Sequence, residues 1–261
     1  MRALIYHNIA EADVADCYTV SPSRFGKHLG WLQAQRLRTP TLRQCLDAGG
    51  RLTSVESTVV LTFDDGFAGW TDRALPLLSA HGMKAVFFVA ICFVEAAEGI
   101  SLLQLRELMG EGMEIGCHGW SHPGDIRRTG PRELQHETHD AKHWLEDRLQ
   151  TEVITYAFPQ GLHDARTAQA ARAAGFALAC TGEGGIMGPH TDPWHLPRFG
   201  ITALTSLRAL NYYLTSRTLV SYRLRRAAVK ALRCLVGTQR CEQLGQSLRH
   251  LVLARAKRKS P

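Results

Sequence analysis

The sequence lacks any run of about 18 apolar residues, the length at which a membrane-spanning helix becomes a candidate. Its first residues, MRALIYHNIAEAD, contain one basic residue and a short apolar stretch that is followed by acids. A secretory signal has a longer apolar region and no such acids, so this stretch fits a first buried strand better. We therefore expect a cytoplasmic protein, with the inner face of the plasma membrane as a further expected location.

Paired cysteines and repeats are also missing. The seven cysteines are scattered along the chain, and no two of them form a C-x-x-C pair. A disulfide framework or a zinc knuckle would need regular spacing, so we expect reduced thiols that lie mostly in the core. No segment repeats at a fixed period, and no tract is of low complexity.

Acidic residues are almost absent from the last part of the chain. Residues 202–261 contain 13 lysines and arginines but one acid, Glu242, which leaves 18 basic and 23 acidic residues in residues 1–201. We expect a folded domain over 1–201 and a basic, helical extension over 202–261 that packs on it. Residues 240–261 are candidates for contact with an anionic membrane. We expect no nucleic-acid partner, because the basic segment has no interleaved aromatic residues and no recognised motif.

What the chain does contain is a regular alternation of strand and helix patterns. The strand candidates are Ala3–His7, Thr58–Asp64, Lys84–Ala90, Met113–Cys117, Val153–Phe158, Phe176–Cys180 and His195–Ile201. Helix starts are marked by Ser21-Pro22, by the capping box of Ser101 and Gln104, by Pro131 and by Asp164. This order predicts βα units around a mostly parallel sheet, and seven strands favour a barrel-like closure. In such folds the chemistry lies at the carboxyl ends of the strands.

Two adjacent carboxylates, Asp64 and Asp65, stand where the second predicted strand ends, and Gly66 follows them. Because the backbone leaves the pleat at a strand end, both carboxylates can converge on one site. Asp-Asp-Gly is also a common turn sequence, so this triplet alone leaves a plain turn as the alternative.

Two histidines four residues apart, His118 and His122, follow the predicted strand that ends at Cys117. Two imidazoles at this spacing can bind one divalent metal ion, although both could also be ordinary surface histidines. The barrel rule brings them to the same end as the aspartates. One aspartate with two histidines is a common catalytic metal set that leaves a position for water.

The sequence TFDDG (62–66), followed about fifty residues later by EIGCHGWSHP (114–123), resembles the polysaccharide deacetylase family, the NodB-homology domain of carbohydrate esterase family 4. Further stretches recur in the same order in its bacterial exopolysaccharide deacetylase branch: LIYHNI, VSPSRFGKHLGWLQ, ALPLLSAHGMKAVFFV, YAFPQG and LPRFGIT. The resemblance covers about residues 1–201, and the basic segment falls outside it.

The resemblance implies a distorted (β/α)7 barrel and a metal-dependent hydrolase that removes an N-acyl group from an amino sugar. It implies that Asp64 is the general base and that Asp65, His118 and His122 hold a divalent metal ion. Zinc is the first candidate, and cobalt, nickel and manganese are the alternatives. The expected substrate is an N-acetylated glycan, glycolipid, or lipid-linked or nucleotide-linked sugar precursor.

Three positions depart from the family pattern. Ala157 stands where many members have an arginine that positions the base, and Gln160 stands where they have a tyrosine. We expect Arg198 to replace the missing arginine, because it also lies near a predicted strand. The backbone N–H of Gln160 could still help to bind an oxyanion. Gly119 replaces a serine or threonine and removes a side-chain hydrogen bond but no metal ligand.

The general acid has no clear match in the sequence. His195, before LPRFG, and His7, at the end of the first predicted strand, are the candidates. Three further histidines, His136, His139 and His143, lie on a polar helix and are interpreted as a solvated face. If the acid and the arginine were both missing, the alternative would be a catalytically silent carbohydrate-binding protein on the same fold.

Overall fold

The computed structural model describes residues 1–11, 17–49, 51–53 and 57–215. Seven parallel strands form one sheet in the order β6-β5-β4-β3-β2-β1-β7. The strands are β1 (Arg2–Tyr6), β2 (Val59–Phe63), β3 (Val86–Val89), β4 (Glu114–Cys117), β5 (Thr155–Ala157), β6 (Leu178–Cys180) and β7 (Phe199–Gly200). Each observed strand lies within a predicted one, except that β1 begins one residue earlier, at Arg2, and the predicted distorted (β/α)7 barrel is confirmed.

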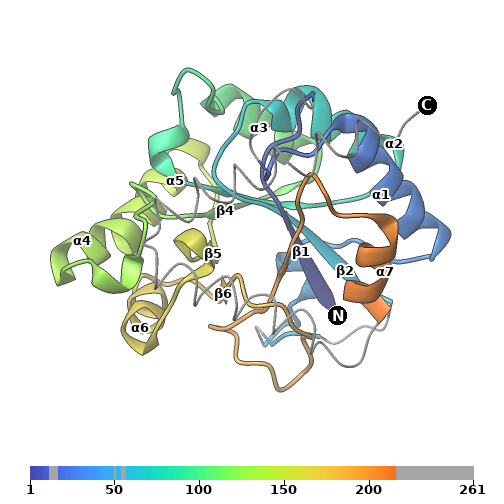
Figure 1. Cartoon of the computed structure of the whole chain (residues 1–261). Coiled ribbons are helices and arrows are strands. Elements are labelled where there is room, and N and C mark those ends of the chain that lie inside the picture. Colours follow the sequence, from blue (N-terminus) through green and yellow to red (C-terminus); the bar gives the residue numbers. More distant parts are fainter. Residues whose placement is uncertain (12–16, 50, 54–56, 216–261) are drawn as a thin grey trace, which may run out of the picture.

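The helices surround this sheet (Figure 1). The α-helices are α1 (Pro22–Ala34), α2 (Leu75–Ala80), α3 (Leu102–Gly110), α4 (Pro131–Gln135), α5 (Ala141–Leu149), α6 (Ala165–Ala173) and α7 (Leu207–Thr215). Two π-helical turns, η2 (Trp70–Ala74) and η5 (His136–Asp140), run directly into α2 and α5. Short 3-10 turns complete the set: η1 (Arg43–Cys45), η3 (Ile91–Phe93), η4 (Ile126–Arg128) and η6 (Pro159–Gly161).

The predicted helix starts are present with their hydrogen bonds. The Ser21 side chain accepts from the backbone N–H of Arg24, and Ser101 forms the expected capping box with Gln104. Asp164 caps α6 in the same way. The helix predicted from Pro131 to about Leu149 is continuous, but its middle is the π-helical turn η5, which the sequence pattern did not predict.

One short segment closes the barrel. Leu196 pairs with Cys180 at the end of β6, and three residues later Phe199 pairs with Leu4 of β1. The segment thus reaches both edges of the sheet. Its regular strand, β7, has only two residues, because the chain must leave one edge before it joins the other. Arg198 lies within this crossing.

Side chains alternate between the two faces of the sheet, as expected for strands. Leu61 and Phe63 pack among the aromatic side chains between the sheet and the helices, where the rings of Phe63 and Phe87 stack with centroids 4.7 Å apart. Val60 packs on the opposite face with Phe88 and Leu178. Because alternate residues of a strand point to the same face, Val60, Thr62 and Asp64 all point to this inner face. The Asp64 side chain is therefore directed toward the barrel interior.

The first helix after the barrel, α7, packs against α1, and its Tyr213 ring stacks on Phe199 with centroids 5.2 Å apart. In the part of the chain that the structure describes, no helix is long and apolar enough to cross a membrane. Residues 240–261, for which the sequence predicts membrane contact, lie outside the described residues. The five cysteines within the described ranges are all free, and Cys45, Cys117 and Cys180 are buried.

Candidate active site

The site lies at the carboxyl ends of β2 and β4. Asp64 directly follows β2, and its backbone N–H donates to the Tyr6 carbonyl at 3.0 Å, which extends the strand ladder by one residue. His118 directly follows β4, and its N–H donates to the Val89 carbonyl at 2.8 Å. Both side chains are therefore positioned by regular strand geometry before the chain turns away.

The local backbone explains how two adjacent aspartates reach one site. Asp65 has a φ of 88°, in the left-handed region that non-glycine residues rarely adopt, and Gly66 follows with a φ of 136°. This turn brings the Asp65 carboxylate back toward His118, instead of to the opposite face of a continued strand. His122 also has a positive φ, 53°. Such strain at a cluster of polar groups is typical of functional sites.

Asp64 forms a buried ion pair with Arg198. The two guanidinium Nη atoms donate to the two carboxylate oxygens at 2.7 and 2.8 Å, and the exposed fractions are 4% for Asp64 and 0% for Arg198. Burial alone would raise the pKa of Asp64, but the charges of Arg198 and His118 and the hydrogen bonds from Arg198 together outweigh it and lower the pKa. The structure thus places Arg198 where the sequence analysis expects the missing arginine.

Arg198 is itself held on every side. Its Nε donates to the Thr181 carbonyl at 3.1 Å and one Nη donates to the Thr62 hydroxyl at 2.9 Å, while its guanidinium lies 5.1 Å from the Phe88 ring centre. A planar guanidinium with bonds to four acceptor atoms cannot rotate freely. Arg198 therefore fixes the orientation of the Asp64 carboxylate.

Asp65, His118 and His122 form a compact cluster beside this ion pair. Their potential ligand atoms lie within 4.8 Å of one another. The Asp65 Oδ1 lies 3.5 Å from His118 Nε2 and 3.2 Å from His122 Nε2. Burial would raise the pKa of Asp65, but the hydrogen bonds from His118 and His122 outweigh it and hold the pKa below its ordinary value.

The chemistry of these donors fits a divalent metal ion. His118 Nδ1 lies 2.7 Å from the Ala157 carbonyl and donates to it, so Nε2 faces the cluster and would become the metal ligand on losing its proton. Ala157, the residue in the arginine slot of the family, thus contributes through its backbone. One carboxylate and two imidazole nitrogens form a donor set suited to zinc and similar ions.

The loop that carries both histidines is fixed by a residue that the sequence analysis did not identify. Glu137, in η5 and only 3% exposed, accepts from the N–H of Trp120 at 2.7 Å and from the N–H and hydroxyl of Ser121. Gly119 has a φ of 87°, and a Cβ there would lie 2.6 Å from Glu137 Oε2. Glycine at this position is therefore required by the close approach of Glu137.

The sequence analysis expects a polar, solvated helix here. The structure corrects this expectation, because Glu137 and Thr138 on this helix are buried. A signal for Glu137 existed in the sequence. One face of this helix carries the apolar residues Leu134, Ala141 and Leu145, which are all buried. Positions 137 and 138 lie on the same face by helical spacing. An acid on such a stripe needs a buried partner.

The two candidates for the general acid lie in different surroundings. A positive charge on His7 would lower the pKa of both Asp64 and Asp65. Its Nδ1 is buried and has no hydrogen-bond partner among the described residues. His195 instead lies 3.0 Å from His163 and 3.2 Å from Glu183, measured between the closest polar atoms. A charge on His7 thus acts on the aspartate pair, whereas the polar contacts of His195 are with His163 and Glu183.

Gln160 has an exposed side chain and a φ of 58°. It lies three residues after Ala157, in the turn η6. Its backbone N–H donates to no acceptor in the part of the chain that the structure describes. This free donor remains a candidate for binding an oxyanion.

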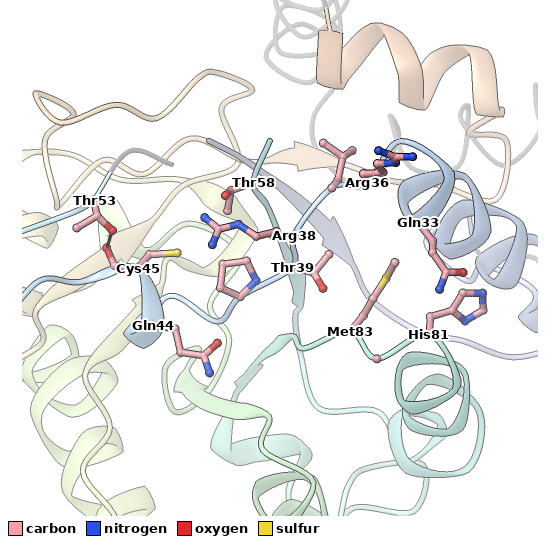
Figure 2. A pocket seen from close by; sticks show the side chains of 13 residues that line it. Gln33, Arg36, Arg38, Thr39, Gln44, Cys45, Thr53, Thr58, His81 and Met83 are labelled. Carbon is pink, nitrogen blue, oxygen red and sulfur yellow. Dashed lines mark hydrogen bonds between the residues drawn. The ribbon is translucent and has the colours of Figure 1, made fainter. Parts of the chain in front are cut away.

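A cavity away from these residues lies at the other end of the barrel. A cavity of about 520 Å³ is lined by residues next to the amino-terminal ends of β2 and β3, among them Thr58 and Met83 (Figure 2). Arg38, Gln44 and His81 also line it. The catalytic side chains of parallel barrels lie at the opposite ends of the strands, so this cavity is not the candidate site.

Comparison with known proteins identifies the family. The sequence model of the family described as polysaccharide deacetylase matches residues 52–179, a range that contains Asp64, Asp65, His118 and His122. The chain belongs to the polysaccharide deacetylase family. It is 25% identical over 217 residues to YxkH of Bacillus subtilis strain 168, which is named as a candidate polysaccharide deacetylase. The match covers 82% of this chain and 75% of that protein.

Solved structures of similar proteins share the fold. The Streptococcus pyogenes deacetylase PplD, solved in complex with acetate, is 25% identical and has a TM-score of 0.74, over 82% of this chain and 97% of that one. IcaB from Ammonifex degensii is 23% identical, with a TM-score of 0.73 over the same shares of each chain. Membership of this family supports a deacetylase, and thus a hydrolase, with an acetylated carbohydrate as its substrate.

Proposed function

We propose that this polysaccharide deacetylase is a divalent-metal-dependent N-deacetylase that acts on an amino sugar within a glycan or a glycan precursor. The observation that carries the proposal is the pairing of two sites. A buried, ionised Asp64 held by Arg198 lies beside Asp65, His118 and His122, whose donor atoms suit a metal ion such as Zn²⁺.

A metal ion bound by these three residues would supply Lewis-acid chemistry, polarising the acyl oxygen and acidifying water. The protein's own groups then divide the proton transfers. Asp64 accepts a proton from the water that attacks the acyl carbon, using a lone pair that Arg198 leaves free. The Gln160 N–H donates to the oxygen that becomes negative as the carbonyl is attacked.

The carbon–nitrogen bond then breaks, and the leaving nitrogen needs a proton. His7 is our candidate donor, because a charge on its ring acts on both aspartates and its buried Nδ1 is unpartnered among the described residues. The products are the carboxylic acid, acetate for an N-acetyl group, and a free amine on the sugar. His195, bound to His163 and Glu183, is too engaged elsewhere to be our first choice.

The interpretation as a silent carbohydrate-binding protein rested on a missing arginine and a missing acid. Arg198 contacts Asp64 from another part of the chain, and His7 is our proposed acid because a charge on it acts on Asp64. No observation now favours that alternative. We therefore retain one function.

The test is acetate release from N-acetylglucosamine oligomers by the full chain, before and after metal removal and Zn²⁺ addition. Asp64→Asn should reduce the rate by about 10²–10⁴-fold, the usual contribution of a general base. Asp147→Asn, at an exposed position of α5, is the matched control and should leave the rate unchanged. A rate that survives both Asp64→Asn and metal removal would overturn the proposal.

A further inference from the structure

The outer face of the helix behind the site carries a pair of histidines whose ring nitrogens converge. His139, in η5, and His143, in α5, are four residues apart, and their side chains are 46% and 55% exposed. Their Nε2 atoms lie 3.1 Å from each other, and the ring centroids lie 4.3 Å apart. Both rings turn the same nitrogen toward one point in solvent-accessible space.

This separation suits a shared metal ion. A zinc–imidazole bond is about 2.0–2.1 Å long, so two such bonds at angles between a right angle and the tetrahedral value place the nitrogens about 2.9–3.4 Å apart. The observed distance falls within that range. Two histidines at i and i+4 on one helical face are a recurring metal-binding pair, since the spacing brings their rings together.

Carboxylates behind the two rings favour the tautomers that a metal ion requires. Asp140 Oδ1 lies 3.0 Å from His139 Nδ1, and Glu146 Oε2 lies 3.8 Å from His143 Nδ1. A carboxylate beside Nδ1 favours a proton on that nitrogen, which leaves the Nε2 lone pair free to bind a metal. With both protons on Nδ1, two lone pairs would face each other at 3.1 Å. A cation between them would remove this repulsion.

The carboxylates are themselves held in place. Asp140 also contacts His136 Nδ1 through its other oxygen, at 3.0 Å, and hydrogen bonds from His136 and His139 lower the pKa of Asp140. Glu146 accepts from Lys142 and from the Val153 N–H. The supporting groups are therefore ordered independently of any metal ion.

From this geometry we propose a second metal site, in which His139 and His143 bind a divalent transition-metal ion of the Zn²⁺, Ni²⁺ or Cu²⁺ class, with water in the remaining positions. The site is separate from Asp65, His118 and His122, and it does not depend on the proposed catalytic function. A metal ion at this site would link His139 of the π-helical turn η5 to His143 of α5 on the solvent-exposed side of the helix.

The buried side of the same turn, η5, binds the loop that carries His118 and His122. Glu137, also in η5, binds the N–H groups of Trp120 and Ser121, and the His136 ring lies 4.2 Å from the Trp120 ring, measured between centroids. A metal ion that joins His139 to His143 would restrict the turn that positions Glu137. The outer site would thus steady the support of the His118–His122 loop.

The experiment measures Zn²⁺ bound by the full chain in equilibrium dialysis with elemental analysis. The unsubstituted protein should bind one more equivalent than the variant His139→Gln/His143→Gln, whether or not the Asp65 site is filled. With Cu²⁺ as the probe in the Asp65→Asn variant, electron paramagnetic resonance should show nitrogen coupling that the His139→Gln/His143→Gln substitutions remove. Asp140→Asn should weaken binding by about tenfold, as expected for a carboxylate behind a ligand.

The matched control is His190→Gln, which removes an exposed imidazole that belongs to none of these contacts. It should leave the outer equivalent in place. Hydrogen exchange of amides 136–143 in the Asp65→Asn variant should slow on addition of Zn²⁺, and it should not slow when His139 and His143 are also substituted. Equal Zn²⁺ stoichiometry in the chains with and without His139 and His143 would overturn the proposal.

Discussion

The two ends of the barrel differ in whether their charged side chains are buried and paired or exposed around a cavity. At the carboxyl end, Asp64 and Arg198 are almost fully buried and every guanidinium contact is specific. At the amino-terminal end, a cavity of about 520 Å³ is lined by Arg36 and Arg38, whose side chains are exposed (Figure 2). The charged groups that line this cavity are thus exposed, whereas those at the carboxyl end are buried and paired.

This difference shows which property marks the functional end of this fold. Burying an ion pair has a large desolvation cost, and a fold retains such a pair only where its geometry is well satisfied or its chemistry is used. Among the described residues, the one group of three converging metal-ligand atoms also lies at the carboxyl end. Buried and oriented charge, and not cavity volume, therefore identifies the site.

The largest expected effect comes from breaking the ion pair. Arg198→Met leaves Asp64 buried without its counter-charge, which should lower the free energy of unfolding by about 3–5 kcal/mol. Urea denaturation followed by circular dichroism measures the change. The double variant Asp64→Asn/Arg198→Met should recover part of the loss, because no unpaired charge remains. Equal or greater destabilisation of the double variant would show that the pair is not coupled in this way.

Removing a cluster ligand should act on metal binding more than on folding. Asp65→Asn weakens one of three donors, and we expect Zn²⁺ affinity at this site to fall by at least about 100-fold, since even supporting residues cost 10–100-fold. Dialysis should be done in the His139→Gln/His143→Gln background, so that only one site is counted. Asp72→Asn, an exposed aspartate after the same strand, is the control. Unchanged affinity in the Asp65 variant would exclude Asp65 as a ligand.

Glu137→Gln tests the support of the loop. Glutamine offers one acceptor oxygen where the carboxylate now serves three donor groups, so one side of the loop would lose its hydrogen bonds. We expect a loss of about 1–3 kcal/mol in stability and a fall of about tenfold in Zn²⁺ affinity at Asp65. Glu133→Gln, exposed on the same helix, should change neither quantity. If both glutamate variants behave alike, Glu137 does not position the loop.

The sequence predicts this carboxyl end well where the information is local. The strand patterns, the helix caps and the residues Asp64, Asp65, His118 and His122 could all be identified from short stretches, because spacing within a motif fixes which side chains share a face. The partner of Asp64 is 134 residues away. Arg198 could still be proposed, because Ala157 leaves the family's arginine position empty and Arg198 also lies near a predicted strand.

What the sequence does not predict depends on backbone geometry that no pattern encodes. The π-helical turn η5 is one such feature; within it Glu137 is buried on the face that the apolar pattern indicated, while the side chains of His139 and His143 are exposed. The positive φ of Asp65 likewise arises from the turn between β2 and η2, and Gly66 only permits it. The choice between His7 and His195 required the folded chain, because both end or precede a strand in the sequence.

The smallest effect is expected at the amino-terminal cavity. Arg38→Ala removes an exposed side chain, and such substitutions usually change stability by less than about 0.5 kcal/mol. We therefore expect unchanged acetate release, metal content and urea denaturation, with Arg36→Ala as a second variant in the same lining. This result would complete the contrast with Arg198→Met, since both substitutions remove a guanidinium from the same barrel. A large loss of activity on Arg38→Ala would contradict the assignment of function to the carboxyl end alone, because no catalytic group described at that end contacts Arg38.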